Sequence, residues 1–496
     1  MGKLKKQFKQ DFDNSSNNIN LSFDTNLLET NNKRTRHNVN PHKLVMALTC
    51  SVIFVLIGVP IGMALISSLR IDESVKTYNR SYSLNEIKIA ESNTFKKLNS
   101  ISYPDGEEPT TSSISEEEEE AYNNFSSLTY QSLVDTSKQD NMSYSLVGLY
   151  SLINEMSFAS SRDELKVQLN NLLGLDEESR ISFYSKVIKA NSFAGDYSTI
   201  QLKNAAFFNN EFNYNDAYIN YLSKLYCEAY QLNFESEQDK IVEWVNEAVN
   251  TNNFIDNDFL EMDEESQLYL FSTLYFKNAW ANKYLSDNNV QDNFYLSNNT
   301  SITAEYMKHS YLSSYYYDYD SYISIKDYYF GRYASVTYLV PKSVEDNIFN
   351  LTKNVNIFSE NEDNKVTPNN DYFMINLKTP KFNTKSDVDF KLCLEDLGLG
   401  DIFNKNIDSF KNAFNDDNLV DYKIYLQKIK QRNEVEFNED GSIVKSVSMA
   451  VIGAAGSAAP MENDTLDVSL NQPFIYIIRD INDTPIFVGH LDNPKA

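Results

Sequence analysis

An uncharged segment at residues 44–69 divides the chain into two unequal parts. Its 26 residues, LVMALTCSVIFVLIGVPIGMALISSL, contain no Asp, Glu, Lys or Arg. As a helix rising 1.5 Å per residue it would be about 39 Å long, enough to cross a hydrocarbon core of about 30 Å. A buried soluble helix is rarely so long, and a removable signal peptide would be shorter and would begin near residue 1. The segment therefore predicts one transmembrane helix.

The charges around this segment predict its orientation. Residues 1–43 contain eight Lys/Arg and four Asp/Glu, a net charge of +4 that leaves −30 on the other 453 residues. Because basic residues favour the cytoplasmic side of a membrane, we expect a cytoplasmic tail over residues 1–43 and a single-pass anchor in the cell membrane. The C-terminal part would then be extracellular. Its acidity disfavours nucleic acid as a partner.

Residues 70–118 are predicted to form an acidic, Ser-rich stalk. They are poor in large apolar residues and lead into TTSSISEEEEE (110–120). A run of glutamates repels itself and stays solvated, and its end can start a helix. The run lacks the Asp/Asn/Gly spacing of a calcium loop, so the sequence favours a stalk over a calcium site.

Residues 119–496 are predicted to form one α+β domain. Apolar residues recur at helical spacing in the first third, as in RDELKVQLNNLLGL and DKIVEWVNEAVNT. Strand patterns dominate later, as in YASVTYLVP, and FIYIIRD and IFVGHL read as a hairpin. Helices followed by strands indicate large, mainly antiparallel sheets.

The same stretch contains no recognisable catalytic motif. A Gly-x-Ser-x-Gly elbow, a phosphate-binding glycine loop and a His-Glu-x-x-His pair are all missing from the sequence. Only His309 and His490 in the body could serve as the base of a Ser/His/Asp triad. The three cysteines and four histidines lie far apart, so they predict neither a disulfide framework nor a zinc site. We expect no enzyme, no catalytic residue, no metal and no cofactor.

Two C-terminal segments carry a family resemblance: NEVEFNEDGSIVKSVSMA (433–450) and LNQPFIYIIRDINDTPIFVGHLDNP (470–494). Further segments follow the same order: EWVNEAVNTNNFI (243–255), TLYFKNAW (273–280) and LKTPKFNTKSDVDFKLCLEDLGLGDIF (377–403). Together they resemble the serpin family over residues 119–496. The resemblance implies three β-sheets, eight or nine α-helices and an exposed reactive loop.

The resemblance also implies a function. A serine or cysteine endopeptidase would attack the loop as a substrate, and the severed loop would insert into the main sheet before the acyl-enzyme hydrolyses. We therefore expect a membrane-tethered, monomeric inhibitor of extracellular proteases. The alternative is a non-inhibitory serpin-fold module that binds a protein or peptide.

The resemblance assigns a hinge at the start of the reactive loop. Its residues are Glu439, Asp440, Gly441, Ser442, Val444, Ser446 and Ser448. Strand alternation places Ser442 and every second residue after it on one face, where their small side chains could enter the sheet. Inhibitory serpins usually carry alanines here, so Ile443, Val444 and Lys445 are departures that would slow insertion. Slow insertion turns an inhibitor into a substrate.

The resemblance also assigns a region where the sheet opens. Its residues are Asn141, Ser145, Ser272 and Gln431. The sequence departs from the family pattern at Leu146, Gly148, Ser272 and Gln431. Gln431 replaces a usual histidine and can donate and accept hydrogen bonds, but it cannot become charged near neutral pH.

The reactive bond has two candidate positions. Counting from Glu439 along the family spacing gives Ala455-Gly456, whereas counting back from the Pro473-Phe474 pair gives a bond near Met461. We favour the first count, because the length of the main sheet determines how many loop residues can insert. A small residue such as Ala455 suits elastase-like or subtilisin-like proteases.

Overall fold

The computed structural model describes residues 86–443 and 464–495, except 105, 107, 138–140, 263–264, 344–347, 354 and 416–421. These residues belong to the second of two compact units of the chain, residues 82–496. The tail and the transmembrane helix that we predict at 1–43 and 44–69 lie outside them and stay predictions. Within the described part, no helix is both long and apolar enough to cross a membrane.

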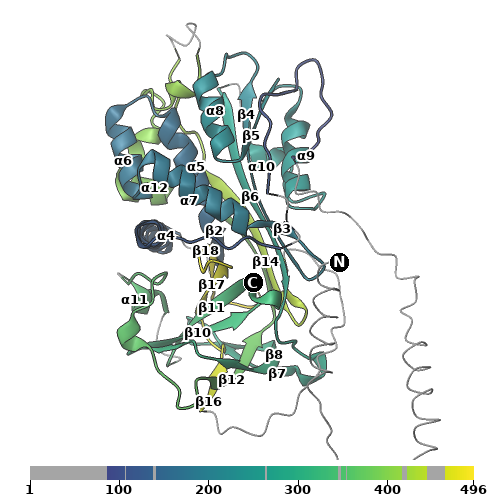
Figure 1. Ribbon diagram of the computed structural model, residues 1–496, viewed down its shortest axis with the longest axis vertical. Helices are drawn as coiled ribbons and strands as arrows, with labels where there is room; N and C mark the ends of the chain where they lie inside the picture. The colour runs from purple at the N-terminus through teal and green to yellow at the C-terminus, as the bar shows by residue number, and fades with distance from the viewer. Residues whose placement is uncertain are drawn as a thin grey trace, which may run out of the picture. The chain divides into compact units, whose positions relative to one another are not determined.

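Nine α-helices occur in the described residues, and most precede the long strands of the second half (Figure 1). Their bounds are α4 Glu116–Thr136, α5 Leu146–Ala159, α6 Asp163–Leu173, α7 Glu177–Ala190, α8 Asp216–Lys224, α9 Gln238–Ala248, α10 Asn257–Leu260, α11 Ile348–Thr352 and α12 Lys391–Leu394.

The run of glutamates begins the longest helix, α4. The N–H of Glu118 donates to Ser115 Oγ at 3.2 Å, and the N–H of Ser115 donates to the Glu118 carboxylate at 2.8 Å. This reciprocal pair is a capping box. Four glutamates in the first turn also lie at the positive end of the helix dipole, which stabilises them. We predict the helix start at the end of the run, but α4 already begins at the first glutamate, Glu116, because Ser115 caps it there.

The strands form three sheets, as the resemblance implies. The main sheet has eight strands in the order β1-β5-β4-β6-β15-β14-β13, with β3 paired to β4. Their bounds are β1 Lys96–Lys97, β3 Ser192–Ala194, β4 Ser198–Asn209, β5 Cys227–Leu232, β6 Leu268–Ala279, β13 Phe382–Asp389, β14 Lys430–Asn438 and β15 Gly441–Ile443.

The other two sheets contain the remaining strands. The six-stranded sheet has the order β2-β18-β17-β11-β10-β9, and the four-stranded sheet has the order β16-β12-β8-β7. Their bounds are β2 Met142–Ser145, β7 Val290–Tyr295, β8 Ser301–Ser313, β9 Tyr316–Asp318, β10 Tyr322–Tyr328, β11 Ala334–Pro341, β12 Phe373–Pro380, β16 Thr465–Ser469, β17 Phe474–Asp480 and β18 Pro485–Leu491. β17 and β18 pair antiparallel, which confirms the predicted hairpin.

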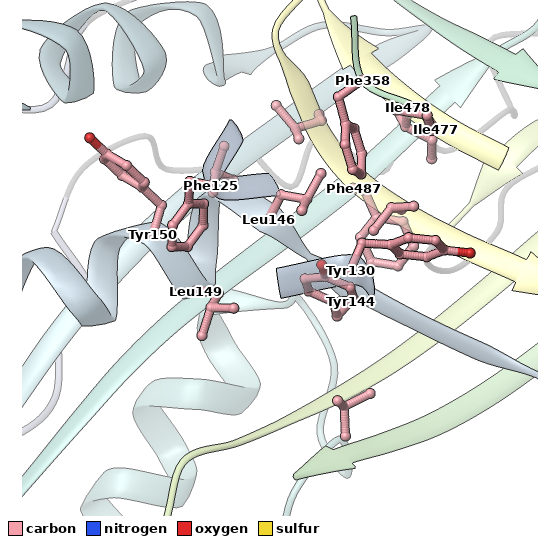
Figure 2. Close-up of a cluster of buried hydrophobic side chains, with 14 of the residues drawn as sticks. Phe125, Tyr130, Tyr144, Leu146, Leu149, Tyr150, Phe358, Ile477, Ile478 and Phe487 are labelled. Carbon is pink, nitrogen blue, oxygen red and sulfur yellow. The ribbon is translucent and has the colours of Figure 1, made fainter. Parts of the chain in front are cut away.

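Two hydrophobic cores lie on opposite faces of the main sheet. The larger contains α5, whose side chains are buried along almost the whole helix. Figure 2 shows side chains of α4 and α5 in one cluster with side chains of β2, β17 and β18 of the six-stranded sheet. The residues labelled there from these elements are Phe125, Tyr130, Tyr144, Leu146, Leu149, Tyr150, Ile477, Ile478 and Phe487. The smaller core lies under α9, where Trp244 packs on Phe207 of β4.

The stalk prediction for residues 70–118 does not hold for residues 86–103. Residues 86–103 lie against the body, and their β1 pairs antiparallel with β5. Five of their side chains are buried: Ile87, Ile89, Phe95, Ile101 and Tyr103. The segment is poor in apolar residues overall, but Ile87, Ile89 and Phe95 enter the smaller core.

Candidate functional site

After β14 the chain turns back and enters the main sheet as the short strand β15. This strand pairs antiparallel with β14 on one side and with β6 on the other. Ser442 lies opposite Phe437 of β14 and Asn278 of β6. The hinge residues Gly441 and Ser442 thus occupy the first positions of a new central strand.

Gly441 lies against the backbone of β6. A Cβ at this position would be 2.0 Å from the carbonyl oxygen of Asn278 and 2.9 Å from Cα of Ala279. Both atoms belong to backbone that is paired within the sheet, so neither can move aside without breaking the pairing. Glycine is required for the hinge to enter here.

The side chain of Ser442 is 2% exposed and faces the core, the face on which the sequence places it. Tyr329 donates its hydroxyl to Ser442 Oγ at 2.7 Å, and its ring stacks on Trp280 at 4.8 Å. Trp280 Nε1 donates to the carbonyl of Asn438, the last residue of β14, at 2.8 Å. The two aromatic residues therefore hold both ends of the turn from β14 into β15.

Charged groups fix the turn itself. Lys381 Nζ donates to the Glu439 carboxylate at 3.0 Å, and Asn289 Nδ2 donates to the same carboxylate. Burial by itself raises the pKa of Glu439, but the hydrogen bonds from Asn289 and Lys381 outweigh it and lower the pKa below the usual range. The N–H of Asp440 donates to Asn438 Oδ1 at 2.9 Å. These contacts hold Glu439 ionised at the entrance of the hinge.

Beyond β15, β6 and β14 form no ladder with each other in the described residues. β6 pairs with β4 and β15, whereas β14 pairs with β13 and β15. A cavity of about 210 Å³ separates them, lined by residues 268–274 of β6 and 430–434 of β14. We call this gap the slot. Val245 and Val249, at the end of α9, also line it.

Three of the predicted sheet-opening residues meet at the wall of the slot. Gln431 accepts the N–H of Ser145 at 2.9 Å and donates to its carbonyl at 3.1 Å. Ser145 Oγ accepts the N–H of Gly148 at 3.1 Å. A Cβ on Gly148 would lie 3.2 Å from both Gln431 Nε2 and Ser272 Oγ, so Ser272 belongs to the same cluster. Its Oγ is buried without a hydrogen-bond partner in the described structure.

Asn141 does not join this cluster. Its Nδ2 donates to the carbonyl of Asn493 at 2.7 Å. Its Oδ1 accepts the N–H groups of Asp492 and Asn493 at 2.8 and 2.9 Å. Asn141 therefore fastens the chain that follows β18.

The other predicted site residues lie outside the described residues and stay predictions. They are Val444, Ser446, Ser448, Ala455, Gly456 and the alternative Met461. The described chain resumes at Asp464, and β16 then pairs parallel with β12.

The two histidines considered as catalytic bases, His309 and His490, are packed inside the domain. The ring of His309 stacks on Tyr284 at 3.8 Å, and its Nε2 lies 3.1 Å from Asp327 Oδ2. His490 is buried in β18. No group of three or more His, Cys, Asp or Glu in the described residues could hold a metal ion.

The sequence did not predict that the hinge would already be seated, or that Tyr329 would contact it. The sequence could have pointed to Trp280, since it ends the segment TLYFKNAW and is one of two tryptophans in the chain. Tyr329 lies in a tyrosine-rich stretch after β10, where nothing distinguishes it from its neighbours in sequence.

Comparison with known proteins identifies the fold and the family. The model of the family described as Serpin (serine protease inhibitor) matches residues 120–494. A serpin-like protein of Acanthamoeba polyphaga mimivirus is 25% identical over 287 residues, which cover 57% of this chain and 69% of that protein. Leukocyte elastase inhibitor of Sus scrofa is 24% identical over 237 residues, covering 47% and 60%.

A solved structure agrees with these matches in fold. The thermophilic serpin tengpin in its native state has a TM-score of 0.65 at 19% identity and covers 77% of this chain and 96% of its own. The family match runs from α4 to the residues after β18, so it includes the hinge, the slot and every strand of the three sheets except β1. This chain therefore belongs to the serpin family, the family of serine protease inhibitors.

Proposed function

We propose that this serpin inhibits serine or cysteine endopeptidases by inserting its cleaved reactive loop into the slot between β6 and β14. The observation that carries the proposal is the seated strand β15, which lies at the head of an unfilled gap in the main sheet. The similarity to leukocyte elastase inhibitor supports a protease of the elastase type as the target.

The register of β15 specifies where each loop residue would go. Continued along both neighbours, it sets Val444 between Phe276 and Val435, Ser446 between Leu274 and Asn433, and Ser448 between Ser272 and Gln431. The small inward residues would therefore meet the core face of the sheet. Ser448 would bring a hydroxyl to the buried Ser272 Oγ, which has no partner in the described structure.

Cleavage of the loop is expected to raise the thermal unfolding temperature by about 20 °C. A strand filling the slot adds on the order of ten ladder hydrogen bonds at about 1 kcal/mol each. In a chain of this size, each kcal/mol raises the unfolding temperature by about 2 °C. The chain would be digested briefly with elastase or subtilisin and melted beside uncleaved chain. A cleaved form that melts at the original temperature would favour the non-inhibitory binding module.

The same digest assigns the reactive bond. We propose Ala455-Gly456, because the tract Gly453-Ala454-Ala455-Gly456 offers small side chains to a protease cleft. Mass spectrometry of the released C-terminal peptide should give Gly456 as its first residue. A peptide beginning at Glu462 would instead place the bond after Met461.

We also propose that residues 44–69 anchor the inhibitor in the cell membrane and keep its domain outside. The proposal rests on the uncharged span and the +4 charge of the residues before it. Protease added to intact cells should degrade the domain and spare the tail. A domain that is protected until the cells are permeabilised would reject this topology.

A further inference from the structure

Residues 86–103 precede the part of the chain that the family match covers, yet they pack tightly on the domain. We call this segment the strap. Its β1 pairs with β5, the ring of Phe95 stacks on Tyr230 at 5.3 Å, and Ile87 and Ile89 are buried in the smaller core. The strap thus adds a strand to the main sheet and side chains to the core under α9.

The strap also completes the hydrogen bonding of a fully buried carboxylate, that of Glu228 in β5. Three donors come from the strap: the N–H of Ile87 at 3.4 Å, Lys97 Nζ at 3.4 Å and the hydroxyl of Tyr103 at 3.1 Å. The body supplies the hydroxyl of Tyr230 and Nε1 of Trp244, the latter at 3.3 Å. A buried carboxylate that lacks its donors is strongly unfavourable. Release of the strap would therefore disturb β5 and α9 together.

A second contact joins the strap to the beginning of α9. Ser92 Oγ donates to Glu237 Oε1 at 2.5 Å, and Glu237 is the N-cap residue of the helix. The strap therefore holds α9 at its N-terminus through Glu237 and at its middle through the shared carboxylate of Glu228.

The helix that the strap holds is also the helix that covers the slot. Val245 directly follows Trp244 in α9 and lines the slot cavity, as does Val249 after the helix. The linker from α9 to β6 contributes Phe254, Phe259 and Leu260 to the same lining. A strand that enters the slot must pass under this cover.

We propose that the strap regulates loop insertion by holding α9 over the slot, with Glu228 as its anchor. The inference rests on the proposed function, since it concerns the same slot. With the strap docked, the cover stays closed and the uncleaved loop stays at β15. With the strap released, α9 loosens and the uncleaved loop enters the slot spontaneously, which uses up the inhibitor.

The test uses the full chain with Phe95→Ala and Lys97→Ala combined, and Lys96→Ala as the matched control. Lys97 contacts Glu228, whereas its neighbour Lys96 on the same strand is exposed. Tyr103→Phe is a milder second variant, because it removes only one hydroxyl donor. Hydrogen exchange over residues 86–103 reports whether the strap is docked. Incubation at 37 °C without protease gives the rate at which the chain converts to a heat-stable, non-inhibitory form.

We expect faster exchange in the strap and about tenfold faster conversion in the double variant, equivalent to about 1.4 kcal/mol of barrier. A smaller increase is expected for Tyr103→Phe, and none for Lys96→Ala. A released strap with an unchanged conversion rate would overturn the regulatory role, and a double variant whose strap stays protected would overturn the anchor. A parent chain that gains no stability on loop cleavage would instead reject the proposed function itself, and the role of the strap with it.

Discussion

Ser442→Arg is expected to abolish covalent trapping of a target protease while cleavage of the loop continues. The Ser442 side chain is 2% exposed and accepts a hydrogen bond from Tyr329, whose ring stacks on Trp280. A guanidinium placed among these rings would lose its hydration, at a cost of several kcal/mol. The first inward residue could then no longer stay in the sheet, and insertion could not begin. The acyl-enzyme would be hydrolysed, and the protease would be released active.

The measurement is the amount of inhibitor–protease complex that survives boiling in detergent, as expected for an acyl-enzyme. Lys445→Ala is the matched control, because the register of β15 would set Lys445 on the outer face, opposite Tyr275 and Glu434. It should trap the protease as well as the parent does. Trapping by Ser442→Arg at the level of the parent would show that insertion does not pass through this position.

Gln431→Leu is expected to lower the free energy of unfolding by about 2 to 6 kcal/mol, since it leaves two buried polar groups unpaired and each costs about 1 to 3 kcal/mol. The substitution leaves the N–H and the carbonyl of Ser145 without the amide that now pairs with both. Because these bonds join β14 to β2 at the wall of the slot, the slot should also open more readily. The variant should therefore insert its uncleaved loop faster than the parent.

Denaturant unfolding of the two proteins gives the difference in stability. Glu434→Leu, on the outer face of the same strand, is the matched control and should change stability little. Neither glutamine nor leucine titrates, so the difference between parent and Gln431→Leu should be the same from pH 5 to pH 8. A Gln431→Leu variant as stable as the parent would show that the amide does not hold this part of the sheet.

The sequence predicted the parts of the fold that depend on local patterns and on ordered motifs. The α+β class and the β17–β18 hairpin follow from the periodicity of apolar residues. Ser145, Ser272 and Gln431 come from three distant segments, so only the family resemblance could group them. That grouping also included Asn141, which the structure places beside Asp492 and Asn493.

Two features of the structure could not be predicted from the sequence, for physical reasons. Whether β15 enters the sheet depends on the balance between pairing with β6 and β14 and opening the gap between them, which no local pattern reveals. The packing of the strap was missed because an average composition poor in apolar residues does not show where its few apolar side chains lie. The strap has few apolar residues, but Ile87, Ile89 and Phe95 each pack against apolar side chains of the domain.

An edge strand that exposes its N–H and C=O groups can pair with a strand of another molecule, which leads to aggregation. Without β1, the six-residue strand β5 would be such an edge of the main sheet. β1 covers it with only two residues, and one of them, Lys96, is exposed. An incoming strand would find little backbone to pair with and a positive charge in its path. We therefore expect the strap also to limit aggregation through this edge of the sheet, whether or not the reactive loop is ever cut.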